Sequence, residues 1–167
     1  MLVDSHRKVV GTEYHQFLLA PDCNRELING QYPELPLAIF ADDTVVILVG
    51  TRAGPVNVEL QIHDSPPRYD DADGEDAAEG DLVYDRDVGI AVWSLVYGVP
   101  EQAIPEDKGR RLTPAGAHRY RVRIYARGKE IEWDGPVFGE PVEDYRIQIW
   151  PTTEPEPSRQ TKHQSGR

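Results

Sequence analysis

The stretch that decides the fold is His118-Arg-Tyr-Arg-Val-Arg-Ile-Tyr-Ala-Arg127. Its apolar residues, which alternate with the arginines, are Tyr120, Val122, Ile124 and Ala126. Successive side chains of a β-strand point to opposite faces, so a strand here would be apolar on one face and carry a ladder of guanidinium groups on the other. In a helix the same apolar residues would spread around the whole circumference. The pattern therefore predicts a half-buried strand.

Other segments show the same two-residue period or continuous β-branched runs, which also indicate strands. These strands are predicted over residues 9–20, 37–40, 44–50, 56–62, 82–97 and 145–150. Gly and Pro residues separate them, 98–116 is predicted as a long connection, and a single helical turn is expected over 24–27. With no helices to connect parallel strands, the chain is predicted to be all-β: an antiparallel β-sandwich of jelly-roll or immunoglobulin type, with a partly open β-barrel as the alternative.

The length of 167 residues is most simply one domain, predicted over residues 1–151. Residues 64–87 hold ten acids and two bases. We expect a mobile acidic loop at about 69–81, because this segment has little apolar surface to offset the entropy lost on ordering. Residues 152–167 offer no side chain that could anchor in a core, so they are predicted to form a disordered tail.

The sequence has no segment near the ~20 apolar residues that a membrane span requires, and no secretory or lipidation pattern. Its single cysteine, Cys23, fits a reducing compartment. We therefore expect a cytoplasmic protein. The net charge of −11 argues against membranes and nucleic acids as partners of the whole molecule, and favours either a basic protein partner or simply solubility.

Residues with catalytic or ligating chemistry form no specific motif. The acidic loop could offer carboxylates to Ca²⁺, but Gly74 comes too early for an EF-hand. His15, His63 and His118 could ligate zinc, yet their spacing implies no common site. Cys23 has no neighbouring base, and no nucleophile elbow or phosphate-binding glycine loop is present. We expect no metal, no cofactor and no catalytic residue, and a binding protein rather than an enzyme.

The arginine ladder belongs to a wider basic strip, since residues 108–129 contain eight bases and no acid. Guanidinium groups pair bidentately with phosphates and carboxylates. The possible anion contacts are Arg119, Arg121, Arg123 and Arg127. The acidic segment 64–87 could instead neutralise this strip within the molecule, which we favour over a nucleic-acid site.

The segment Val10-Gly-Thr-Glu-Tyr14-His-Gln16-Phe17-Leu-Leu, followed by sandwich-like strands, resembles the bacterial competence protein J group. The resemblance covers this first strand and the rhythm of the later ones. It implies a small soluble β-sandwich that acts as an inhibitor of a DNA-entry nuclease. It identifies no functional residue, but an acidic protein that blocks a basic nuclease surface agrees in sign with the net charge.

Three functional hypotheses follow. The first is a non-enzymatic acidic protein-binding module, an inhibitor or immunity factor of a basic nuclease or toxin. Its partner contacts would be Asp70, Asp71, Asp73, Glu75, Asp76 and Glu79. The second is a small-ligand-binding or catalytic sandwich whose concave face presents Tyr14, His15, His63 or the arginine ladder. The third is a nucleic-acid contact through the arginine strip, testable by replacing Arg121 and Arg123.

Overall fold

The computed structural model describes residues 1–22, 35–41, 43–114 and 116–166, and all regular structure in them is β. The predicted helical turn at 24–27 and Cys23 lie outside the described residues. The strands are β1 (Leu2–Glu13), β2 (Gln16–Ala20), β3 (Ala38–Ala41), β4 (Thr44–Leu48), β5 (Ala53–His63), β6 (Asp76–Arg86), β7 (Ala91–Val96), β8 (Val99–Ile104), β9 (Gly116–Arg127), β10 (Asp144–Pro151) and β11 (Arg159–His163). The described part of the chain has no helix with the length and apolarity needed to cross a bilayer.

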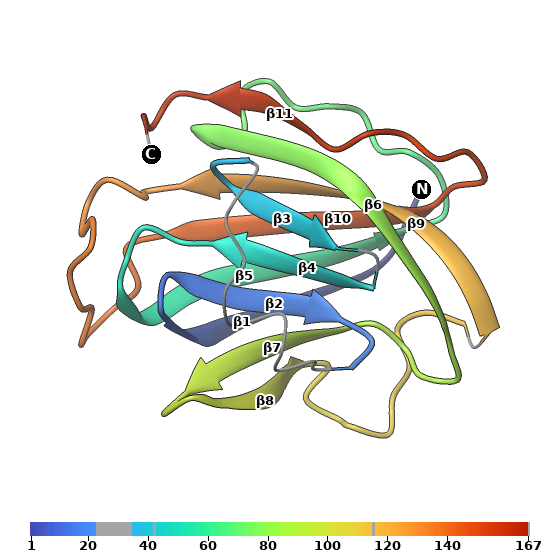
Figure 1. Ribbon diagram of the computed structural model, residues 1–167, viewed down its shortest axis with the longest axis horizontal. Coiled ribbons are helices and arrows are strands. Elements are labelled where there is room, and N and C mark those ends of the chain that lie inside the picture. The colour runs from blue at the N-terminus through green and yellow to red at the C-terminus, as the bar shows by residue number, and fades with distance from the viewer. Residues whose placement is uncertain (23–34, 42, 115, 167) are drawn as a thin grey trace.

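One mixed sheet contains all of these strands. The order is β11-β6-β9-β10-β5-β1-β2-β4-β3, with β7 and β8 continuing from β2. The sheet folds back on itself without closing into a barrel, so that β2, β4 and β3 lie in front of β5, β10 and β9 (Figure 1). The predicted all-β class is confirmed. The expectation of purely antiparallel pairing is corrected at one place, because β10 enters between β9 and β5 and runs parallel to β5.

The core fills the space between the two layers. The predicted inward residues of β9 are buried, with Tyr120 5% and Val122 0% exposed. Across the core, the ring of Phe17 on β2 meets that of Tyr145 on β10 edge-on, with centroids 5.5 Å apart. On β6, Gly80 lies so close to Phe40 of β3 that an added Cβ would sit 2.2 Å from the ring. Close approach of the layers therefore requires glycine at position 80.

The predicted strand over 9–20 is a β-hairpin. Strands β1 and β2 are joined by Tyr14 and His15, whose φ angles are 53° and 61°. Consecutive positive φ values define a turn whose twist matches that of the strands, usually built from Asn and Gly. Because this turn lacks Gly, no turn signal interrupts the strand pattern, and the sequence predicts one strand in place of two. Strand β1 also begins at Leu2 and pairs with β5 along its whole length.

Four further predictions are corrected. The strand expected over 82–97 is two strands, β6 and β7, separated at residues 87–90, and the connection expected over 98–116 contains β8. The tail expected to be disordered contains β11, which pairs with β6. The acidic loop expected at 69–81 ends earlier, because β6 begins at Asp76. Strand β11 is held by backbone pairing and ion pairs, and the first buried apolar residues of β6 are the small Ala77 and Ala78. Hydropathy therefore does not reveal β11 or the first part of β6.

Candidate functional site

The outer face of the sheet, opposite the core, is polar across β1, β5, β10 and β9. The register aligns Arg7 with Glu59 and Glu59 with Arg146, and it aligns Arg146 with Tyr125. These side chains alternate with core residues on each strand, so they share the outer face. One end of this face is open and the other is covered by chain segments.

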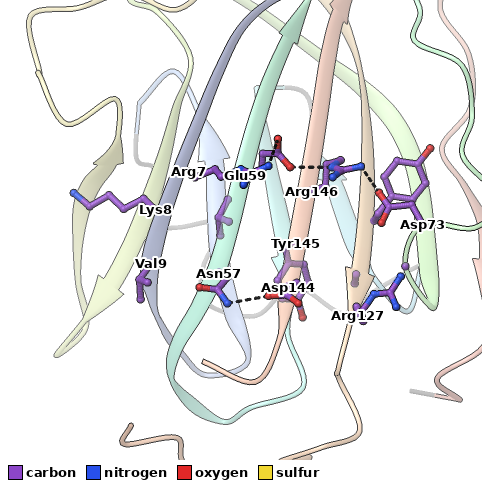
Figure 2. Close-up of a pocket in the computed structure, with 14 residues that line it drawn as sticks. Arg7, Lys8, Val9, Asn57, Glu59, Asp73, Arg127, Asp144, Tyr145 and Arg146 are labelled. Atoms are coloured by element: carbon purple, nitrogen blue, oxygen red, sulfur yellow. Dashed lines mark hydrogen bonds and ion pairs between the residues drawn. The ribbon is translucent and has the colours of Figure 1, made fainter. Parts of the chain in front are cut away.

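The open end is a groove of about 560 Å³ that runs from β1 to residues 73–74 (Figure 2). A chain of ion pairs crosses its floor. Arg146 donates from Nε to Glu59 Oε2 at 2.9 Å and from Nη1 to Asp73 Oδ2 at 2.8 Å, and Arg7 Nη2 lies 3.5 Å from Glu59 Oε1. Along the next row, Asn57 Nδ2 donates to Asp144 Oδ1 at 2.9 Å.

The carboxyl group in the middle of this floor stays ionised. Burial alone would raise the pKa of Glu59, but the hydrogen bonds from Gln61 and Arg146 and the charge of Arg146 outweigh burial and lower it. A general acid or base needs a pKa near the working pH. The pKa of Glu59 is shifted away from neutrality, so Glu59 itself does not fit the role of a general acid or base at neutral pH.

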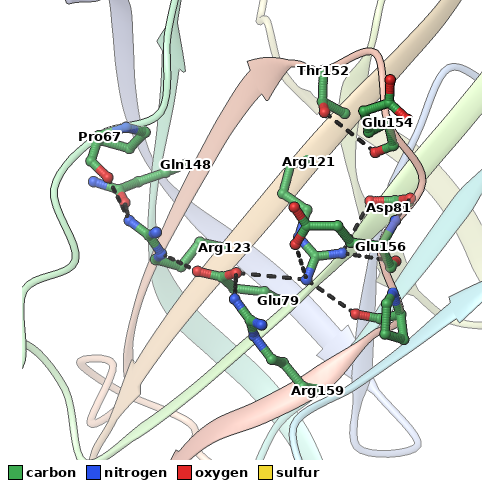
Figure 3. A network of polar contacts seen from close by, with 11 residues as sticks. Pro67, Glu79, Asp81, Arg121, Arg123, Gln148, Thr152, Glu154, Glu156 and Arg159 are labelled. Carbon is green, nitrogen blue, oxygen red and sulfur yellow. Dashed lines mark hydrogen bonds and ion pairs between the residues drawn. The ribbon is translucent and has the colours of Figure 1, made fainter.

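The covered end buries Arg123, which is 7% exposed. Its Nε donates to Glu79 Oε1 at 2.6 Å, and its Nη1 donates to Gln148 Oε1 at 3.2 Å and to the carbonyl of Pro67 at 3.0 Å (Figure 3). The guanidinium also lies over the ring of Trp150, 5.0 Å from its centroid. Buried arginine is tolerated here because hydrogen bonds and a carboxylate replace its hydration.

Arg121 is buried beside it, 3% exposed, beneath the segment that leads into β11. Its Nη1 donates to Asp81 Oδ1 at 3.0 Å and to the carbonyl of Glu156 at 3.1 Å, and its Nη2 donates to the carbonyl of Pro157 at 3.1 Å (Figure 3). The segment that was predicted to be a disordered tail therefore supplies carbonyl groups to the centre of the arginine ladder.

Glu79 is the common partner of this cluster. Besides Arg123, it lies 3.6 Å from Arg121 Nη2 and 3.2 Å from Arg159 Nη2. Burial alone would raise its pKa, but the hydrogen bond from Arg123 and the charges of the three arginines lower it. The expected internal neutralisation of the basic strip by the acidic segment is thus present as specific contacts.

The structure divides the four predicted anion contacts into buried and exposed residues. Arg121 and Arg123 are buried and engaged, and Arg119 is partly exposed with Nη1 2.9 Å from Asp81 Oδ2. Arg127 is exposed and lines the groove. The ladder is not a continuous exposed strip, so a nucleic-acid contact through Arg121 and Arg123 has no support.

The predicted partner contacts also differ in exposure. Asp70 and Asp71 are exposed, whereas Asp73 and Glu75 are partly exposed and form internal contacts. Two residues cannot contact a partner and are corrected, because they are buried at the start of β6: Asp76 (0% exposed) and Glu79 (4% exposed). Asp76 accepts hydrogen bonds from the hydroxyl of Ser165 at 2.5 Å and from the backbone amides of 164 and 165.

The histidines are not brought together. His15 lies in the β1–β2 turn and contacts Asp134, His63 ends β5 and contacts Gln61, and His118 lies near the start of β9. No group of potential metal ligands occurs in the described residues. Tyr14 is 73% exposed at its turn, and packed side chains fill the inner faces of the layers. The concave-face alternative therefore has no support.

The groove residues Arg7, Glu59 and Arg146 were not predicted as a site. Glu59 and Arg146 lie at outward positions that the two-residue periods of β5 and β10 indicate, whereas Arg7 lies in β1 before the strand predicted over 9–20. Their convergence depends on the parallel pairing of β5 with β10, and no local sequence signal specifies that pairing.

No known protein family and no curated protein matches the sequence itself. The fold is that of a class of small all-β proteins with solved structures. One is ComJ from Bacillus subtilis, an inhibitor of the DNA-degrading activity of NucA; the TM-score is 0.55 and the identity 11%, covering 91% of this chain and 99% of ComJ. Another is the crocagin biosynthetic gene J protein, with a TM-score of 0.57 and 14% identity, covering 90% and 98%. The resemblance to competence protein J thus holds for the fold.

Proposed function

We propose that this protein is a non-enzymatic binding module that inhibits a nuclease through a basic surface of that nuclease. The observation that carries the proposal is the distribution of charge. The chain has a net charge of −11, and three of its bases, Arg121, Arg123 and Lys129, are no more than 7% exposed. Three acids of the described residues, Asp76, Glu79 and Glu143, are equally buried, so these bases and acids cancel and the excess negative charge lies on the accessible surface. The ComJ-like fold supports the inhibitor role, since ComJ inhibits NucA.

The proposed contact is the exposed part of the acidic loop, Asp70 and Asp71, together with Asp73 at the edge of the groove. The loop is held in place beside β9, because the backbone amide of Asp70 donates to the hydroxyl of Tyr125 at 2.9 Å. Carboxylates on an ordered loop provide electrostatic complementarity, which accelerates association and selects the partner.

The test mixes the protein with NucA of Bacillus subtilis and with any NucA-type nuclease that its own source genome encodes, and measures degradation of plasmid DNA. We expect inhibition of at least one nuclease. The double variant Asp70→Asn/Asp71→Asn should slow association about tenfold at low salt. Asn preserves the hydrogen bond that Asp70 Oδ1 accepts from the amide of Ala72.

The matched control is Asp85→Asn/Glu101→Gln, which removes two exposed charges elsewhere and should leave association unchanged. If the wild type neither binds nor inhibits either nuclease, the proposed function is wrong. Equal association rates for the loop variant and the control would instead exclude the acidic loop as the contact.

A further inference from the structure

Four connections meet at one end of the molecule, on the left of Figure 1: the β1–β2, β4–β5 and β7–β8 turns and the segment 128–143. Direct contacts join them. His15 Nε2 lies 2.8 Å from Asp134 Oδ1, and the amide of Asp134 donates to the carbonyl of Gly50 at 2.9 Å. The carboxylate of Glu13 accepts hydrogen bonds from the amides of Tyr97 and Gly98.

This end exposes large apolar side chains. Seven of the twelve large hydrophobic residues exposed in the described part of the chain lie here. They are Tyr14, Val96, Tyr97, Val99, Ile131, Trp133 and Phe138. Phe138 is 94% and Tyr97 93% exposed. We call this set the aromatic end. Aromatic side chains clustered on a surface are typical of the buried centre of protein interfaces.

The aromatic side chains are displayed on a fixed scaffold. Tyr14 and Tyr97 both have φ near 53°, a backbone conformation that disfavours side chains other than Asn or Gly. The segment that carries Phe138 is tied to the sheet, because the amide of Val137 donates to the carbonyl of Ala53 at 2.9 Å. A surface ordered before binding loses less conformational entropy when a partner docks.

The charge around the aromatic end selects the kind of partner. Glu132, Asp134 and Glu140 are exposed in the segment 128–143, whose single base, Lys129, is 2% exposed. An apolar centre with an acidic rim complements a protein surface that has apolar recesses and a basic rim. The acidic loop borders the same end, since Glu75 Oε1 accepts a hydrogen bond from the amide of Gly128 at 2.8 Å.

We infer that the aromatic end is the surface on which the nuclease docks, with Phe138 and Tyr97 as its anchors. This inference rests on the proposed function and adds a division of roles to it. The acidic loop steers the encounter and sets the association rate, whereas buried aromatic anchors hold the complex and set the dissociation rate.

The test measures association and dissociation rates on immobilised nuclease, using whichever of the two nucleases the wild type inhibits. The variant Phe138→Ala/Tyr97→Gly removes both rings, and Gly suits the positive φ at position 97. We expect dissociation at least tenfold faster, with association within about twofold of wild type. The matched control, Val3→Ala/Val88→Ala, truncates two exposed apolar residues elsewhere and should change neither rate.

The outcomes separate the two proposals. If the wild type binds and inhibits while Phe138→Ala/Tyr97→Gly dissociates at the wild-type rate, the aromatic end is not the docking surface and the proposed function stands. If the wild type neither binds nor inhibits, both fall. If the wild type is a dimer in sedimentation, the variant is a monomer and nuclease binding is unchanged, the aromatic end pairs two copies of this chain and the inference is overturned.

Discussion

Arg121 and Phe138 both lie where their chemistry disfavours them. The arginine is 3% exposed beneath the segment leading into β11, and the phenylalanine is 94% exposed at the aromatic end. Burying a guanidinium is tolerable only where partners replace water, and Arg121 has carboxylates and carbonyls around it. An exposed ring gains nothing for folding. The first arrangement therefore serves the fold, and the second is available for binding.

The largest effect should come from breaking the buried cluster at its centre. Glu79→Gln leaves Arg121 and Arg123 buried without their shared carboxylate and should lower the free energy of unfolding by about 3–5 kcal/mol. Urea denaturation followed by circular dichroism measures this. Glu101→Gln, at an exposed position, is the control and should cost less than about 0.5 kcal/mol. Equal losses for the two variants would show that the cluster adds nothing to stability.

The same cluster predicts a pH dependence. Burial favours the protonated form of Glu79, but the arginines outweigh burial, so its folded pKa lies below the usual 4.5. A depressed pKa contributes stability that is fully present above the unfolded value and is lost as the pH falls through the folded value. The stability difference between wild type and Glu79→Gln should therefore shrink between pH 7 and about pH 3.5. A difference independent of pH would contradict this assignment.

A smaller loss is expected where the two layers touch. Gly80→Ala places a Cβ against the ring of Phe40 and should lower the free energy of unfolding by about 1–3 kcal/mol. Gly139→Ala is the matched control, since nothing lies within 4 Å of its added Cβ. Thermal unfolding compares the two. Tolerance of alanine at both positions would mean that β3 does not pack on β6 as closely as described.

The smallest effect is expected at the aromatic end, where Tyr14 has a disfavoured backbone conformation. Tyr14→Asn keeps the turn in a conformation that Asn adopts readily, so it should raise the free energy of unfolding by about 1 kcal/mol. Tyr14→Phe retains the disfavoured backbone and should leave stability unchanged. A gain for Asn alone would indicate that the Tyr14 ring is present at the aromatic end although it lowers the free energy of unfolding. Destabilisation by Asn would show that Tyr14 serves the fold.

The two-residue period predicted the central strands well. The inward residues of β5, β9 and β10 are buried as expected, because each strand has one face on the core and its pattern records that face. The neutralisation of the arginine ladder was also foreseeable, since the acids of 64–87 were the nearest source of opposite charge.

The missed features are those whose cause lies far away in the sequence. Strand β11 is held by pairing with β6 rather than by apolar residues of its own. The β1–β2 turn uses Tyr14 and His15 without the usual Gly. The groove exists only because β10 pairs with β5, and the aromatic end only because four separate connections meet. Periodicity reports which face of a segment is buried, but not which segments become neighbours.

The parallel alignment of β10 with β5 bears on how the chain is made. Strand β10 inserts between β5 and β9, so β5 has no neighbour on that side until residues 144–151 have left the ribosome. Until then, a nascent chain exposes an unpaired strand edge beside half-assembled apolar surface, a condition that favours aggregation. Pairing between segments so distant in sequence is slow, so the interval between the synthesis of β5 and that of β10 is the vulnerable period for this protein.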